Sequence, residues 1–171
     1  IRLLRECDAG VKMGVESIEE VVDRIESKEF RQVLVESRHQ HDELDREIQQ
    51  QLDRYKDDGK EPNPMAKGMS WMKTNAMLMM KPSDQTIADL MTDGCNMGVK
   101  SLNKYLNQYP VADSKVKDIC KRLIKIEEKL GEGYIKIKET IQVEYLVKIS
   151  DSKFEPLVPT ESEVIYNFNL V

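Results

Sequence analysis

The chain has 171 residues, of which 40% are apolar and 33% are charged. That length suits one domain with a sizeable core, and that composition excludes both a disordered chain and a membrane protein. The net charge of −5 argues against nucleic-acid binding, which needs a basic surface.

The first two predicted elements form a helical hairpin. Over residues 3–25 and 28–57, apolar residues recur three and four positions apart, which is the spacing of one helix face. Ser27 is a suitable N-cap for the second helix, and Gly59 suits the left-handed position that ends it. Because the connection is short, the two helices should be antiparallel.

A long connection leads to the third of the long helices. Segment 58–83 contains several prolines and should cross the bundle, with a short helix over 64–80. Ser83 or Asp84 should cap the third long helix. This helix should end just before Pro110, because the residue preceding a proline is pushed out of the helical region.

The fourth helix should begin at Asp113 or Ser114, and two alternatives remain open for the chain after about residue 140. Apolar residues alternate over 141–149 and again over 164–170, which is the pattern of strands. The segment is therefore either a small β-hairpin or a prolonged fourth helix followed by an irregular tail. On either reading, a bundle domain spans 1–149 and a C-terminal tail spans the residues 150–171.

Two of the helices share one sequence pattern, Gly-x-x-Met-Gly-Val-x-Ser followed by Ile or Leu, over 10–18 and 94–102. The constant offset of 84 residues, and of 86 in the helix that follows each, makes His41 equivalent to Glu127. This predicts two duplicated hairpins packed about a pseudo-two-fold axis. Glycine permits close approach of backbones, so four glycines are expected where helices cross: Gly10, Gly14, Gly94 and Gly98.

A duplicated hairpin with a long central connection resembles the ferritin-like bundle superfamily. The stretches Pro-Asn-Pro-Met-Ala-Lys-Gly-Met-Ser-Trp over 62–71 and Asp-Gly-Cys-Asn-Met-Gly over 93–98 are similar to an uncharacterised bacterial branch of it. The resemblance covers residues 3–138. It implies an up-down-down-up bundle with a crossover between its halves, and it implies no activity, because that branch has none assigned.

Metal-using members of that superfamily need a Glu on each of two helices and a Glu-x-x-His on each of the other two. The one such motif here, Glu36 to His39, lies about 120° to 180° from the apolar face of its helix and should point to solvent. Its equivalents by the repeat, Arg122 and Lys125, cannot ligate a metal. We therefore expect no di-iron site, no catalytic residue and no cofactor.

Two ionisable residues, His41 and Glu127, fall on the apolar faces instead. They could form an acid/base pair or half of a metal site, but no nucleophile or third ligand lies near them in the sequence. Buried charges need partners, so we interpret them as a polar pair in the core.

Six of the nine methionines fall between residues 65 and 80. Methionine fills irregular gaps in cores, so this helix could simply cover the bundle. Because it is apolar on more than one side, it could also present a surface to a partner or a second copy, and thioethers could bind Cu(I). The candidate contact residues are Met65, Met69, Trp71, Met72 and Met79.

The sequence does not identify a function. The leading hypothesis is a non-enzymatic bundle that acts through protein contacts, as a homodimer or larger assembly. The alternative is a metal-binding or redox protein with an altered site in the bundle core. Three cysteines without paired spacing and the lack of a signal-peptide pattern indicate a cytoplasmic protein, with neither nucleic acid nor membrane as a partner.

Overall fold

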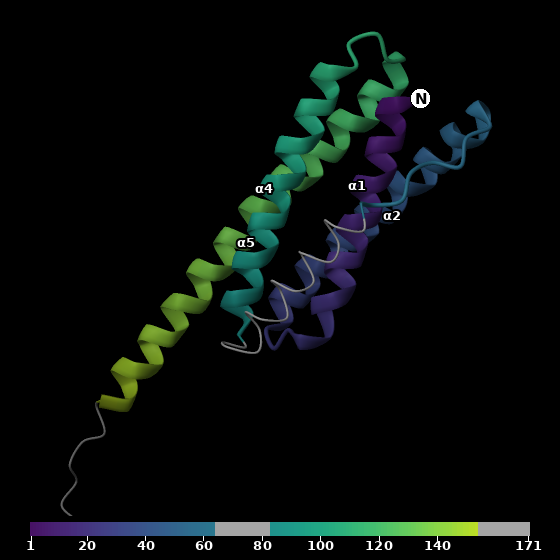
Figure 1. Ribbon diagram of the computed structural model, residues 1–171. Coiled ribbons are helices and arrows are strands. Elements are labelled where there is room, and N and C mark those ends of the chain that lie inside the picture. Colours follow the sequence, from purple (N-terminus) through teal and green to yellow (C-terminus); the bar gives the residue numbers. More distant parts are fainter. Residues whose placement is uncertain (64–82, 154–171) are drawn as a thin grey trace, which may run out of the picture. The chain divides into compact units, whose positions relative to one another are not determined.

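The computed structural model describes residues 1–63 and 83–153, and all the regular structure in these ranges is helical (Figure 1). Four α-helices pack together, so the prediction of an all-α, four-helix chain is confirmed. The short helix expected over 64–80 and the candidate contact residues on it lie outside the described residues. The elements are α1 (Arg2–Val21), the 3-10 helix η1 (Val22–Arg24), α2 (Lys28–Tyr55), α4 (Asp84–Gln108) and α5 (Ser114–Lys153).

Residues 1–139 form one compact unit, and residues 140–171 form a second. Residues 140–153 are helical and continue α5, so the strand considered over 141–149 is wrong and the prolonged helix is right. Adding a residue to an existing helix costs little, and this outweighs the strand preference of single residues. Residues 164–170 lie outside the described ranges, and the domain boundary at residue 149 stays a prediction.

Side chains at the helix starts tie the hairpins to each other. Ser27 caps α2 and Ser83 caps α4, and each hydroxyl accepts a hydrogen bond from the backbone N–H three residues on, at 3.2 and 3.1 Å. Asp84 does not cap its own helix. Its carboxylate accepts the backbone N–H groups of Glu26 and Ser27 at 2.9 and 2.6 Å, so α2 and α4 begin at the same end of the bundle.

The end of α2 differs from the prediction. Lys56, not Gly59, takes the left-handed C-cap position, with φ of 53°. Gly59 also has a positive φ, 77°, but it lies in the loop beyond, where a Cβ would fall 2.2 Å from Oδ2 of Asp8. This glycine is therefore required by its positive φ in the loop and by a tertiary contact, and not by the helix end.

Asp8 anchors this loop to α1. Its carboxylate is fully buried and accepts hydrogen bonds from Gln49 Nε2 at 2.8 Å, from the Lys60 backbone N–H at 2.7 Å and from Lys12 Nζ at 3.2 Å. Three more ion pairs join α1 to the same loop, Arg5–Asp57, Glu6–Lys60 and Lys12–Glu61. The direction in which the chain leaves α2 is thus fixed by charge pairs.

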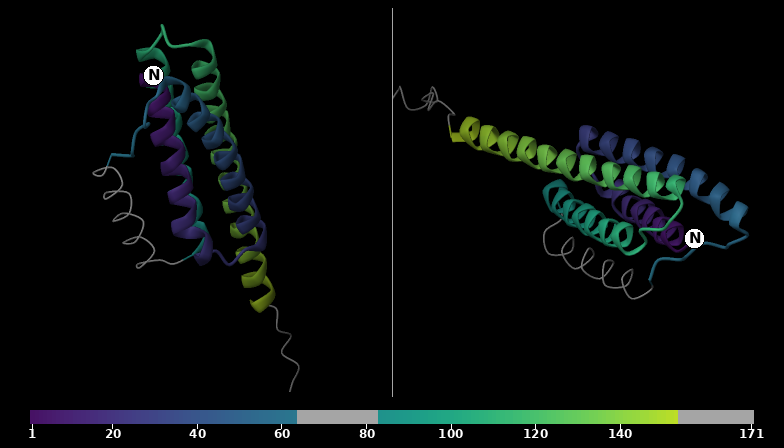
Figure 2. Two further views of the ribbon diagram at one scale, coloured as in Figure 1. Left: turned by 90° about the vertical axis from the view of Figure 1, so that its right-hand side faces the viewer. Right: turned by 90° about the horizontal axis from the view of Figure 1, so that it is seen from above.

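Within the first unit, α1 is the neighbour of both α2 and α4, and α5 lies beside α2 (Figures 1 and 2). The contacts fix the directions, because Phe30 stacks edge-on against Tyr134 while Glu47, further along α2, pairs with Arg122. Helices α2 and α5 are therefore antiparallel. Because α2 and α4 begin at the same end of the bundle, they run in the same direction. Taken in chain order, α1, α2, α4 and α5 therefore run up, down, down and up.

The core consists of two apolar clusters separated by one polar layer. One cluster contains Leu4, Ile48 and Leu123, and the other contains Phe30 and Tyr134. On each of the four helices, one or two residues lie between the parts that join the two clusters, and on α2 these are Ser37 and His41. One residue from each helix is in the contacts at the centre. These four residues define what we call the central layer: Gly14, His41, Gly98 and Glu127.

Candidate functional site: the central polar layer

The central layer brings His41 and Glu127 into direct contact. Nε2 of His41 lies 3.0 Å from Oε1 of Glu127, and its Nδ1 lies 2.9 Å from the carbonyl oxygen of Ser37. The two side chains come from α2 and α5 and are 86 residues apart in the chain. His41 is 1% exposed and Glu127 is 8% exposed, so the contact is almost fully dry.

Gly14 makes room for the His41 ring, because a Cβ on Gly14 would lie 2.6 Å from Nε2 of His41. Gly98 lies beside Glu127, where a Cβ would be 3.4 Å from Cδ of Glu127, at the edge of ordinary van der Waals contact. The expectation that these glycines bring helix backbones together stays a prediction. At Gly14, a flat imidazole fills the space that the missing Cβ leaves.

The other two repeat glycines behave differently. A Cβ on Gly10 would be in ordinary van der Waals contact with Leu123, at 3.5 Å. Gly94 is exposed, and no atom of the described residues lies within 4 Å of the position of its Cβ. The predicted crossing is therefore wrong at Gly94, because this residue faces away from the core on α4.

The internal repeat explains why the layer has these members. The repeat relates Gly14 to Gly98 with an offset of 84 residues and His41 to Glu127 with an offset of 86, and in the structure Gly14 lies beside His41 as Gly98 lies beside Glu127. The two residues that the repeat makes equivalent in sequence, His41 and Glu127, are in direct contact.

The hydrogen bonds fix where the protons lie. A carbonyl oxygen only accepts, so Nδ1 of His41 carries a hydrogen and donates it to Ser37. The hydrogen bond between Nε2 of His41 and Oε1 of Glu127 then requires one further proton, which lies between these two atoms. Burial by itself would lower the pKa of His41, but the hydrogen bond and the charge of Glu127, with the Ser37 carbonyl and Asp42, outweigh it and raise the pKa above its ordinary value. The contact with Glu127 thus favours the protonated form of the His41 ring.

Cys95 and Tyr134 adjoin the layer, and sequence reasoning did not assign them to it. Ser37, which the helix spacing places on the inward face with His41, also adjoins the layer. Burial raises the pKa of Cys95, and Glu127 raises it further. Burial likewise raises the pKa of Tyr134, although Ser37 opposes this. Both groups are therefore protonated at neutral pH, and a protonated thiol is a poor nucleophile.

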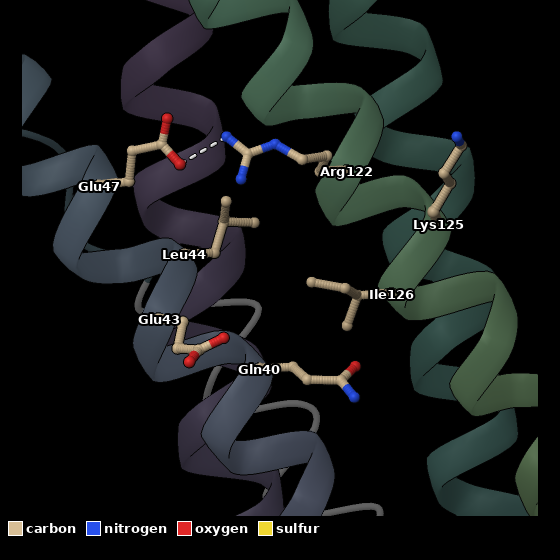
Figure 3. A pocket seen from close by; sticks show the side chains of 7 residues that line it. All are labelled: Gln40, Glu43, Leu44, Glu47, Arg122, Lys125 and Ile126. Carbon is tan, nitrogen blue, oxygen red and sulfur yellow. Dashed lines mark hydrogen bonds and ion pairs between the residues drawn. The ribbon is translucent and has the colours of Figure 1, made fainter.

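A groove of about 400 Å³ opens between α2 and α5 on the surface near the pair (Figure 3). Leu44 and Ile126 form its apolar part, and Glu47 bonds to Arg122 across it at 2.5 Å. Figure 3 shows the amine of Lys125 pointing away from this bond. The polar groups of the groove do not converge on one point, as those of a small-molecule site would. The remaining lining residues are Gln40 and Glu43.

Metal ligands are likewise not gathered anywhere in residues 1–63 or 83–153, where no group of three or more His, Cys, Asp and Glu side chains could hold an ion. Glu36 and His39 are exposed, as the helix spacing predicted, and His39 pairs with Glu43 at 3.3 Å. Nε2 of His41 and Oε1 of Glu127 are engaged with each other. Either atom could ligate a metal only if that hydrogen bond broke.

The raised pKa of His41 predicts how stability depends on pH. A histidine whose pKa is raised in the folded state stabilises the fold fully below the unfolded pKa of about 6.5, and this contribution disappears as pH rises through the folded pKa. As pH rises above about 6.5, we expect Tm to fall by more in the parent chain than in His41→Gln. The control is His39→Gln, whose side chain is 61% exposed and whose profile should follow the parent. Equal slopes in all three proteins would contradict the assignment.

No helix in the described part of the chain is both long enough and apolar enough to span a bilayer. The chain matches no protein-family model, no curated protein and no solved structure.

Proposed function

We propose that this chain is a ferritin-like helical bundle that acts through protein–protein contacts, as a homodimer or larger assembly, and that its core performs no chemistry. The directions of the four helices, the pseudo-two-fold repeat and the long connection between the hairpins support the family assignment. In the centre of the bundle, the two ionisable side chains satisfy each other, and the thiol beside them is protonated. This arrangement stabilises a fold more readily than it assists a reaction.

The observation that carries the proposal is an exposed apolar face near the end of α5. Val143, Leu146 and Val147 are spaced three and four residues apart, so they share one face of the helix, and they are 59%, 58% and 52% exposed. Apolar side chains gathered on one helix face commonly mark a contact surface. A second copy of the chain is the simplest partner, because it carries the same face.

Light scattering during size-exclusion chromatography tests this proposal. We expect a mass of about twice the chain mass of 19.8 kDa, or a higher multiple. Val143→Asp should reduce the mass to that of one chain, because a charge would be buried at the contact. The matched control is Val35→Asp, since Val35 is an isolated valine on α2 with a similar exposure of 57%. A monomeric parent protein at the highest soluble concentration would contradict the proposal.

Elemental analysis of the same preparation distinguishes the alternative function. Iron, manganese, zinc or copper bound near one ion per chain would favour a metal-binding or redox protein. Loss of that metal in Glu127→Gln would then place the ion in the central layer.

A further inference from the structure

We infer that the contact between His41 and Glu127 determines which hairpins can pair. The contact favours packing of the α1–α2 hairpin against the α4–α5 hairpin. It disfavours packing of either hairpin against a copy of itself. This inference concerns the assembly of the bundle core, and it does not depend on the proposed function.

The two hairpins are alike enough for this choice to matter. The repeat pairs Leu44 with Leu130 and Val33 with Ile119, although it also pairs the larger Phe30 with Val116, so the apolar packing of the two halves is alike in part. Apolar contacts are also non-directional, and they tolerate exchange of residues of similar volume. Such packing by itself would allow an α1–α2 hairpin to pair with the α1–α2 hairpin of another chain.

A pair of two α1–α2 hairpins would place His41 against His41 at the axis. Nδ1 of each ring is already committed as a donor to the carbonyl oxygen of Ser37 on its own helix. Two neutral rings would therefore face each other with two acceptor nitrogens. A proton added between them would form a hydrogen bond but would leave a net positive charge in a dry core.

A pair of two α4–α5 hairpins would place Glu127 against Glu127. Two carboxylates in one buried site cannot both be ionised, so one of them would have to bind a proton at neutral pH. Only the mixed pair brings a donor to an acceptor without net charge, and the structure shows that pair at 3.0 Å. Single buried polar residues select partners in this way in coiled coils.

The space for either side chain exists on both halves. Gly14 accommodates the group at position 41, and Gly98 accommodates the group at position 127. The carbonyl of Leu123 precedes position 127 by the same four residues that separate Ser37 from His41, so it could accept an imidazole N–H. The pair should therefore still form when the two residue types are exchanged between the hairpins.

An exchange experiment on the full-length chain tests the inference. The variants are His41→Glu, Glu127→His and the double exchange. Each single variant creates one of the rejected pairs and should lower Tm by roughly 10 °C. The double exchange restores a mixed pair and should recover at least half of the summed loss. If the double exchange lowered Tm by as much as the two single variants do together, the inference would be overturned.

Two controls and one milder cycle complete the design. His39→Glu and Glu128→His make the same changes at exposed positions of the same helices, and they should change Tm by no more than about 2 °C. If the double exchange does not fold, the cycle is measured with His41→Gln, Glu127→Gln and both together. Non-additive losses are expected there as well, and additive losses would equally overturn the inference.

Discussion

Replacement of Gly14 by alanine should lower the free energy of unfolding by about 2–3 kcal/mol, and Tm by roughly 5–10 °C. The new Cβ would lie 2.6 Å from Nε2 of His41. The ring cannot move aside freely, because the Ser37 carbonyl holds one nitrogen and Glu127 holds the other. The better helix propensity of alanine returns only about 1 kcal/mol.

The repeat supplies a matched control for this prediction. Gly94 lies in the same sequence pattern on α4, but it is exposed and has no described atom within 4 Å of its Cβ position. Gly94→Ala should therefore raise the free energy of unfolding by about 0.5–1 kcal/mol. Urea unfolding monitored by circular dichroism measures both changes. Effects of the same sign at the two sites would show that His41 does not fill the space beside Gly14.

The second large effect is expected at Asp8. Asp8→Asn should lower the free energy of unfolding by about 2–3 kcal/mol, because an amide offers one acceptor oxygen where the buried carboxylate uses two. The backbone N–H of Lys60 or the side-chain amide of Gln49 would then face another donor. The ion pair of Asp8 with Lys12 would also be lost.

The same variant should loosen the loop that follows α2. Asp8 binds the Lys60 backbone directly, so trypsin should cleave after Lys56 and Lys60 several-fold faster in Asp8→Asn than in the parent chain. Asp58→Asn is the control, because Asp58 lies in this loop but is exposed. If the two variants were cleaved at the same rate, the buried carboxylate would not be what anchors the loop.

Burial of a polar pair carries a desolvation penalty that burial of an apolar pair does not carry. Leucine at both positions could fill the same volume, and replacement of a buried ion pair by apolar residues is often neutral or stabilising. Apolar residues, however, would not distinguish one hairpin from a copy of itself. Two similar hairpins in one chain therefore give a physical reason for a central layer that sacrifices stability for specific pairing.

The sequence by itself determined the helices and most of their ends. Apolar spacing over α1, α2 and α5 gave one buried face per helix, and this face alone placed His41 and Glu127 inside and His39 outside. The repeat made the two inner residues equivalent. These results follow from local periodicity, which a single helix already possesses.

Only the tertiary structure decided what those residues touch. The reason for Gly14 is the ring of His41 on a neighbouring helix, and Gly59 combines a positive φ with the nearby carboxylate of Asp8, 51 positions away in the chain. Local pattern also could not decide between strand and helix over 141–149, where α5 simply continues. Residue type and periodicity report burial, whereas donors, acceptors and free space are properties of pairs of residues that the fold alone brings together.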